Sequence, residues 1–364
     1  MLADTSNVSS EQRVGAAMFR NIDYMYEMET MMRFTDDRLK NILRKMRING
    51  GAKLTPDEKQ SLRNTALDAS QLKRESADLA DWYESSYLWS IVSMAMYTRA
   101  RQSARKQGQR LYICQAADHI YTTSAGKEYT DLYDRILRVH NLSTTSKLPP
   151  FALFHVGMRG RLTSQVLAPW AVQDCTGEVM EILFSDVDLA AQRSELHAGE
   201  GGDVTQFAAE YCLQSFPKGI YFKLDDCDQE FLPPKVCEAH RLVGFCATCD
   251  HCRNFPVWVL VEPLSRKWQH ADDVLDTTFG VERTQLPIMP EKACSLYTLQ
   301  GATTEPGMIA HLALPRRAGA DMMWLIVYVM LSRVRSLDKL KTTGMNTDKE
   351  FSRILNIIEG GRPR

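Results

Sequence analysis

The stretch that decides the fold is YVMLSRVRSLDKL, residues 328–340. Its first half is an apolar run typical of a buried strand, and the run is followed at once by Ser332 and Arg333. An arginine held by a rigid element suits a site that must neutralise charge on a phosphoryl group in transfer. The same pattern also allows a structural arginine that caps a sheet edge or pairs with a carboxylate.

A second informative stretch, LYTLQGATTEPG, covers residues 296–307. It reads as a strand that passes into a loop, where Gln300, Gly301 and Thr303 offer amide and hydroxyl groups to a phosphate or to a nucleic-acid backbone. The alternative is a tight turn after a strand, for which glycine is common.

The bulk composition describes an ordinary globular protein. The chain has 364 residues, enough for two domains or for one large domain with insertions. It is 44% hydrophobic and 24% charged, and no apolar run reaches the roughly 18 residues that would span a bilayer. The net charge of −1 gives no global attraction to nucleic acid. Nine cysteines without an evident disulfide framework, and the lack of a signal sequence, predict an intracellular protein that is not secreted, in the nucleus or the cytoplasm.

Periodicity divides the chain into three parts. We expect a flexible N-terminus over residues 1–20 and a helical segment over 21–80, with a helix start at Thr55-Pro56 and Glu58 three residues after Thr55. Residues 87–97, 99–108 and 110–116 read as strand, helix and strand, the pattern of a parallel sheet.

The second half continues with strands and closes with a helix. Paired strands are expected on either side of a loop at residues 168–177, then an irregular, Cys-rich insertion at about 185–255, further strands, and a helix over 348–358. The predicted class is therefore α/β.

Together the two stretches closely resemble the last two motifs of superfamily-one DNA helicases, in the Pif-type branch (the petite-integration-frequency family). Earlier segments follow the same order: the stretch around Arg33, the Val156-Gly157-Met158 entry to a strand, the Cys175-Thr176-Gly177 turn, and VERTQLPIMP at 281–290. The resemblance implies a second RecA-like motor domain over residues 81–364. It would be a parallel-sheet domain with an inserted small β element and an N-terminal helical extension.

The resemblance also implies roles for particular residues. Arg33 and Arg333 would reach ATP phosphates, with Arg333 as the catalytic arginine, and Gln300 and Gly301 would lie at the nucleotide. Thr303 would contact single-stranded DNA. For Arg33, the alternative is a solvated helix arginine near two aspartates.

Two departures from the family pattern bear on activity. Tyr297, Thr298 and Leu299 stand where the family has His- or Asn-Lys-Ser, at positions that would face nucleic acid. The sequence also contains no G-x-x-x-x-G-K-[ST] loop to hold the β and γ phosphates and Mg²⁺. ATP and Mg²⁺ are therefore expected only with a complete first motor domain, a missing partner, and the chain alone is expected to hydrolyse ATP poorly.

A basic cluster on the predicted helix is a second candidate for nucleic-acid contact. Arg99, Arg101 and Arg105, with Lys106, could bind backbone phosphates. The alternative is a solvated helix face.

The sequence CEAHRLVGFCATCDHC, residues 237–252, is a candidate for structural zinc. Cys237, Cys246, Cys249 and Cys252 provide four thiolates, enough for a tetrahedral site. Their spacing is tighter than in most zinc modules, so a cysteine-rich loop in a reduced protein is the alternative.

Two other functional classes remain open from the sequence. The chain could be a helicase relic that binds nucleic acid without hydrolysing ATP, with binding that falls steeply with salt. It could instead be a structural or interaction protein, with the Cys-rich region and the acidic 190–230 region as partner surfaces.

Overall fold

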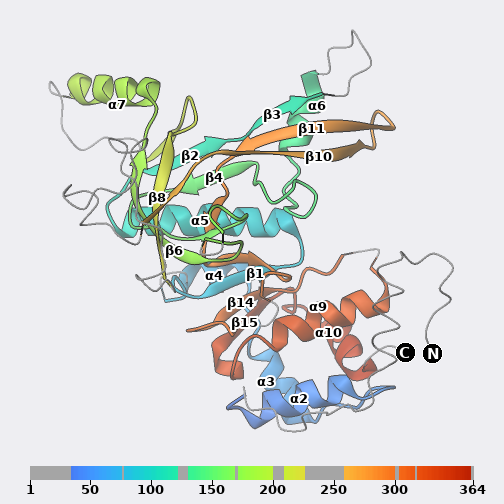
Figure 1. Ribbon diagram of the computed structural model, residues 1–364. Coiled ribbons are helices and arrows are strands. Elements are labelled where there is room, and N and C mark those ends of the chain that lie inside the picture. Colours follow the sequence, from blue (N-terminus) through green and yellow to red (C-terminus); the bar gives the residue numbers. More distant parts are fainter. Residues whose placement is uncertain are drawn as a thin grey trace.

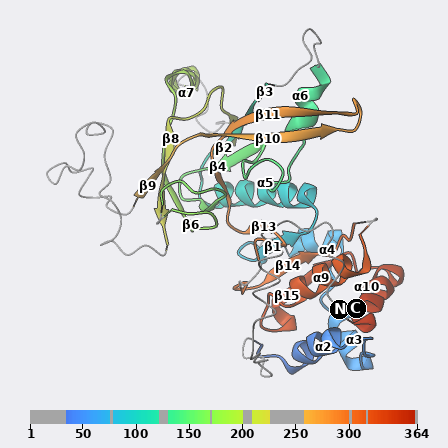
Figure 2. The same ribbon diagram turned by 45° about the vertical axis from the view of Figure 1, so that its right-hand side comes forward.

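The computed structural model describes residues 34–75, 78–121, 130–168, 171–199, 209–225, 258–299, 303–315 and 318–361. It has two main hydrophobic cores, and its long helix α5 (Trp89–Lys106) contributes its buried apolar residues to the second of them. On one side lies a parallel sheet with four helices, and on the other a β-rich part (Figures 1 and 2). The α/β class predicted from the sequence is confirmed.

A four-stranded parallel sheet forms the centre of the first part. Its order is β13 (Ala293–Ser295), β1 (Tyr83–Ser86), β14 (Met308–His311) and β15 (Leu340–Thr343). Successive residues of a strand point to opposite faces. Cys294 accordingly joins the core under the helices, while Ala293 joins the core on the α5 side.

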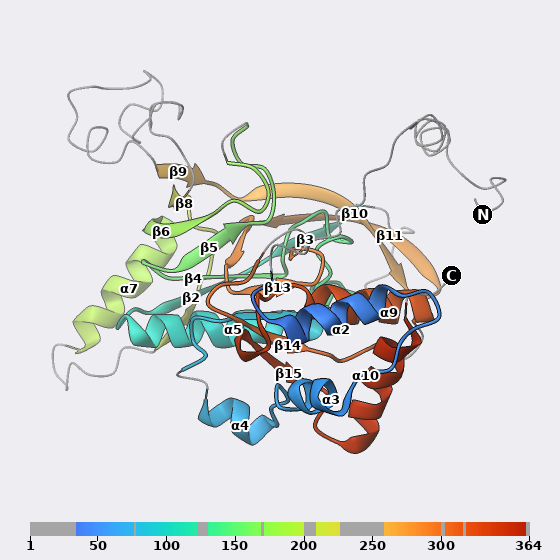
Figure 3. The ribbon, with the colours of Figure 1, turned by 90° about the horizontal axis from the view of Figure 1, so that it is seen from below.

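Four helices pack on the sheet face opposite α5, and Figure 3 views this side. They are α2 (Asp37–Arg47), α3 (Pro56–Arg63), α9 (Ala320–Leu331) and α10 (Asp348–Gly360). α3 starts with the capping box expected at Thr55 and Glu58. A short helix, α4 (Ala69–Arg74), completes the described part of the helical segment predicted for residues 21–80.

The β-rich part is inserted between α5 and β13 and is larger than the small β element predicted. It contains three sheets within the described residues, in the orders β10-β11-β3, β12-β5-β6-β8-β9 and β4-β2-β7. The strands are β2 (Leu111–Gln115), β3 (Ala117–Ile120), β4 (Phe151–Phe154), β5 (Arg159–Leu162), β6 (Thr176–Leu183), β7 (Glu210–Cys212), β8 (Gly219–Leu224), β9 (Trp258–Val261), β10 (Leu264–Asp272), β11 (Thr277–Gln285) and β12 (Ile288–Pro290). The predicted strand pair around the 168–177 loop is confirmed as antiparallel β5 and β6.

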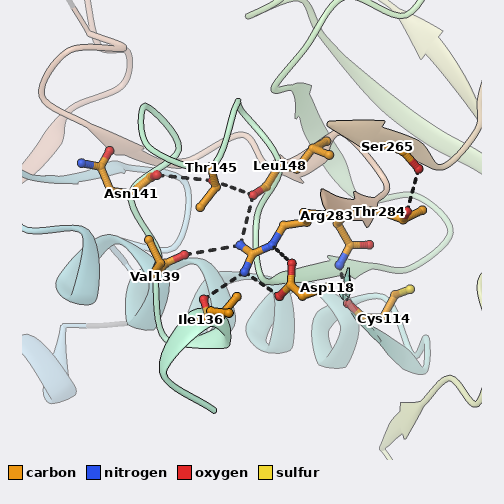
Figure 4. A network of polar contacts seen from close by, with 11 residues as sticks. Cys114, Asp118, Ile136, Val139, Asn141, Thr145, Leu148, Ser265, Arg283 and Thr284 are labelled. Atoms are coloured by element: carbon orange, nitrogen blue, oxygen red, sulfur yellow. Dashed lines mark hydrogen bonds and ion pairs between the residues drawn. The ribbon is translucent and has the colours of Figure 1, made fainter. Parts of the chain in front are cut away.

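A buried arginine holds the β10–β11 hairpin to the rest of the insertion (Figure 4). The Arg283 side chain is fully buried and donates from Nε and Nη2 to the two carboxylate oxygens of Asp118, at 2.7 and 2.8 Å. The same guanidinium donates to the carbonyl oxygens of Ile136, Val139 and Leu148. One side chain therefore joins β11, β3, the end of α6 (Thr130–Leu137) and the loop before β4.

The strand predicted at residues 87–97 is wrong, because this stretch belongs to α5. The buried residues of α5 recur at helical spacing: Val92, Ala95, Met96, Arg99, Ala100 and Ala104. The true strand before the helix is β1, and β1 and β2 belong to different sheets. The expected strand-helix-strand unit is therefore not formed by β1, α5 and β2.

The apolar run at 326–330 is also a helix, α9, rather than a strand. Ile326, Val327, Val329, Met330 and Leu331 are all buried, so the helix is apolar around most of its surface and shows no periodicity. The irregular insertion predicted at about 185–255 is more regular than expected, since its described portion contains α7 (Asp186–Gly199), β7 and β8. In the part of the chain that the structure describes, no helix has the length and apolar character needed to cross a membrane.

Candidate functional site

The two decisive stretches of the sequence lie against each other. Arg333 donates from Nη1 to the carbonyl oxygen of Leu299 at 3.0 Å. In return the carbonyl oxygen of Arg333 accepts from the backbone N–H of Thr304 at 2.9 Å and from its hydroxyl at 3.2 Å. Residues 299 and 304 are thus both held by Arg333, on either side of Thr303.

Arg333 itself is buried, with 9% of its surface exposed. It follows directly on the end of α9, and its Nε donates to the carbonyl oxygen of Val329 at 3.0 Å. Its Nη2 donates to the hydroxyl of Ser332 at 2.7 Å. These contacts join α9 to the 299–304 segment. The element before this arginine is therefore a helix and not the predicted strand, and the predicted contact of Arg333 with a phosphate stays a prediction.

The turn before this segment is closed by hydrogen bonds. Ser295 ends β13, and its carbonyl oxygen accepts from the N–H of Thr298 at 3.1 Å. Their two hydroxyls are also 3.1 Å apart. Leu296 and Leu299 are buried in the core, which leaves the Tyr297 side chain between them on the outside, 47% exposed.

The carboxyl edge of the parallel sheet gathers polar and aromatic side chains. The strands run in one direction, so residues at and just after their ends meet at one edge. Tyr87 follows β1, Tyr297 follows β13, His311 ends β14 and Thr343 ends β15. The rings of Tyr87 and Tyr297 lie with centroids 6.3 Å apart.

A buried charge network lies under this edge, between the sheet and α5. Glu84 accepts from Arg99 Nε at 3.1 Å and lies 2.7 Å from His311 Nε2. His311 Nδ1 is 2.8 Å from the hydroxyl of Thr343. Burial opposes ionisation of Glu84, but the hydrogen bond with His311 and the charge of Arg99 hold the pKa of this carboxyl below its usual value. Nothing in the sequence pattern singled out Glu84 or His311, because their partners are distant along the chain.

The segment after Arg33 is attached to the turn that follows Arg333. The N–H of Thr35 donates to the carbonyl oxygen of Arg335 at 3.0 Å. A carboxylate oxygen of Asp36 accepts from the N–H of Leu337 at 3.0 Å. Arg33 lies outside the described residues, as do Gln300 and Gly301, so their predicted nucleotide contacts stay predictions.

The basic residues predicted to form one surface on α5 face different parts of the molecule. Arg99 faces the sheet, is 8% exposed, and also donates to the carbonyl oxygens of Leu79 and Ala80. Arg101 forms an ion pair with Glu210 at 2.6 Å. Arg105 is exposed to solvent. The prediction failed for Arg99 because a helical repeat of 3.6 residues per turn places it about 120° around the helix from Arg105, on the side that is buried against the sheet.

The four cysteines predicted as zinc ligands lie outside the described residues. Among the residues that are described, no three His, Cys, Asp or Glu side chains come together in a way that could hold a metal ion. Asp225, the residue after β8, has protein partners within the described structure. It is paired with Arg159 and accepts from the hydroxyl of Thr176, which holds its pKa below the usual range.

No family model matches this chain, and no curated protein matches it in sequence. Its fold is similar to solved Pif1 helicases. The Pif1 helicase from Candida albicans is 16% identical with a TM-score of 0.45, and the alignment covers 90% of this chain and 60% of that one.

Two structures of Pif1 from Bacteroides give a comparable result. The complex with ADP-AlF3 and ssDNA is 13% identical with a TM-score of 0.46, covering 90% of this chain and 53% of that one. The complex with ssDNA is 13% identical with a TM-score of 0.45, and the alignment covers 88% of this chain and 52% of that one. The chain thus spans little more than half the length of these helicases, and residue roles are not carried over at such identities.

Proposed function

We propose that this chain is the second RecA-like motor half of a Pif-type ATP-dependent DNA helicase, acting inside the cell together with a first motor half. The observation that supports this most directly is the contact between the two decisive stretches through Arg333, Leu299 and Thr304. In a motor of this kind the nucleotide side and the single-strand side must be mechanically joined, and the contacts of Arg333 with Leu299 and Thr304 would provide this connection.

The proposed mechanism rests on what Arg333 holds in place. ATP would bind between the two motor halves, with the phosphate loop and the Mg²⁺ ligands supplied by the first half. Arg333 and Arg33 would approach the γ-phosphate from this side. When the Arg333 guanidinium turns toward phosphate oxygens, it releases the carbonyl of Leu299. The turn that bears Tyr297 and the segment at Thr303 would then shift along the bound strand.

ATP hydrolysis by the purified chain, with and without single-stranded DNA, tests the proposal. We expect no turnover from the chain alone. Addition of a first motor domain from a Pif-type helicase is expected to give DNA-stimulated turnover. Arg333→Ala should lower this turnover by about a thousandfold, the scale of a lost arginine finger.

Arg335→Ala is the matched control, because Arg335 lies two residues further on and is 57% exposed in an ion pair with Glu305. It should retain most of the turnover. Hydrolysis by the chain alone, or equal loss in both variants, would contradict the proposal.

A second candidate is a nucleic-acid-binding module without ATP hydrolysis. The observation in its favour is that Arg333 already bonds to protein oxygens in a chain without a phosphate loop. In that case the first motor domain would add no turnover, while single-stranded DNA would still bind with an affinity that ATP does not change.

A further inference from the structure

A pocket of about 250 Å³ lies between α5 and the inserted β-rich part. From α5 it is lined by Trp89, Met96 and Tyr97, and from β4 by Phe151 and Leu153. Of the described residues that line this pocket, none belongs to the candidate site at the carboxyl edge of the parallel sheet. Apolar walls gain dispersion contacts when a molecule fills the space between them. These walls therefore suit a ligand with large apolar surfaces.

The loop between α6 and β4 forms a further wall of the pocket, and Arg283 holds this loop in place (Figure 4). Arg283 Nη1 donates to the carbonyl oxygens of Val139 and Leu148, at 3.4 and 3.5 Å. His140 and Leu142, which line the pocket, lie in the loop between these two carbonyls. A wall that is fixed before the ligand arrives loses little conformational entropy on binding. The contacts of Arg283 thus preorganise the pocket.

A hydrogen-bonded pair of polar side chains also lines the pocket. The hydroxyl of Ser93 lies 2.9 Å from Nδ1 of His140. Within the described part of the chain, this is the one hydrogen bond of the His140 side chain. The second ring nitrogen, Nε2, can donate or accept, depending on the tautomer. His140 can thus bind one polar atom of a ligand that is otherwise apolar.

The walls of the pocket carry no charge. No Asp, Glu, Lys or Arg side chain is among the described residues that line it. Burial and the charge of Arg283 lower the pKa of His140, so its imidazole is neutral at physiological pH. An ionised ligand would lose its hydration here without gaining a counter-charge. The pocket therefore favours an uncharged molecule and disfavours the phosphates of a nucleotide or a nucleic acid.

We propose that this pocket binds an uncharged, mainly apolar ring compound, packed against Trp89 and Tyr97 and hydrogen-bonded through one polar atom to His140. Ligand sites typically combine apolar and aromatic walls with a few polar groups that fix the orientation, and this pocket has both. Its aromatic side chains favour a planar ligand. The proposal does not depend on the proposed helicase function, because the described residues of the pocket and of the candidate site do not overlap.

The test measures binding of two fluorescent probes to the full chain. N-phenyl-1-naphthylamine is neutral and has one N–H, whereas 1-anilinonaphthalene-8-sulfonate has the same rings and a negative charge. We expect the neutral probe to bind at least about tenfold more tightly, because the sulfonate would be desolvated without a partner. Ser93→Phe should weaken binding of the neutral probe by a similar factor, since the added ring occupies the pocket. Leu142→Trp should do the same from the loop wall.

Met94→Phe is the matched control, because Met94 is next to Ser93 on α5 but is 72% exposed. It should bind the neutral probe like the wild type. Circular dichroism shows which variants fold, and if one blocking variant does not fold, the other is used. The proposal is overturned if the wild type does not bind the neutral probe or binds both probes equally well. It is also overturned if a folded blocking variant binds the neutral probe like the wild type, since the probe then lies elsewhere.

Discussion

Arg283 and Arg333 are both buried arginines, and both occur in stretches that resemble helicase motifs. Arg283 has a carboxylate partner, Asp118, and three backbone carbonyls around it. Its role in the described structure is to hold the inserted β-rich part together. Arg333 donates to oxygens of Leu299, Val329 and Ser332 and thereby joins α9 to the 299–304 segment.

Replacement of Arg283 by methionine should strongly destabilise the protein. The methionine fills much of the space but leaves Asp118 buried without its partner, a change that costs about 3–5 kcal/mol. Arg266→Met is the control, because Arg266 lies opposite Arg283 on β10 and is exposed. The free energy of unfolding from urea titration measures both, and equal stability of the two variants would contradict the role of the buried pair.

The elements show how much of the fold the sequence could predict. Helix caps and turns depend on residues that are close together in the sequence. The sequence could therefore predict the starts of α3 and α10 and the pairing of β5 with β6. The helix predicted at residues 99–108 matches the second half of α5, but the first half of α5 and the whole of α9 could not be predicted, since a short apolar run fits a buried strand and a buried helix equally well. β1, with the sequence YESS, carries no apolar signature and is a strand only because β13 and β14 lie on both sides of it.

In the candidate site, too, some features could be predicted from the sequence and others could not. The sequence could predict that residues 296–307 and the Ser332-Arg333 pair belong to one site, because both carry motif residues. It could not predict that Arg99 is buried against Glu84, nor that Tyr87 packs beside Tyr297. Both contacts join residues that are far apart along the chain and depend on the order of strands in the sheet.

The last turn of α10 provides a pH-dependent contact between helices. Glu359, with a side chain 7% exposed, lies 2.9 Å from Lys53 and 2.8 Å from Lys59, and accepts from the N–H of Leu54. Burial opposes ionisation, but these three partners lower the pKa of Glu359 to about 2. The folded pKa lies below the unfolded value of 4.5, so the stabilisation is present above pH 4.5 and is lost as the pH falls toward 2.

Glu359→Gln should therefore be less stable than the wild type by about 1–3 kcal/mol at pH 7, and the difference should shrink as the pH is lowered from 4.5 toward 2. Chemical denaturation at a series of pH values measures it. Asp338→Asn, at a side chain 70% exposed, should show little difference at any pH. A constant difference between wild type and Glu359→Gln over this range would mean that ionisation of Glu359 does not contribute.

At the scale of the whole molecule, charge contributes little to the proposed binding of single strands. The net charge is −1, and Arg99, Arg101 and Arg335 each have a carboxylate partner. The logarithm of the binding constant should therefore fall with the logarithm of salt concentration with a slope of only about −1 to −2, as for two or three phosphate contacts.

Fluorescence anisotropy with a labelled dT strand at several salt concentrations measures this slope. Arg105→Ala should reduce the slope by about 0.7 if the exposed Arg105 contacts a phosphate. Arg101→Ala should leave it unchanged, since Glu210 already neutralises Arg101. A slope several times steeper in the wild type would mean that more than two or three phosphate contacts form, and it would contradict this expectation.

The insertion of β2 to β12 between α5 and β13 has a consequence for how the protein is made. β1 emerges from the ribosome first but pairs only with β13 and β14, which begin at residues 293 and 308. The inserted strands can pair among themselves well before then, and domains generally fold as units during synthesis. The sheet that carries the Tyr87–Tyr297 pair would thus be completed last, around an insertion that is already folded, and an interrupted synthesis would release a chain in which β1 has no neighbour.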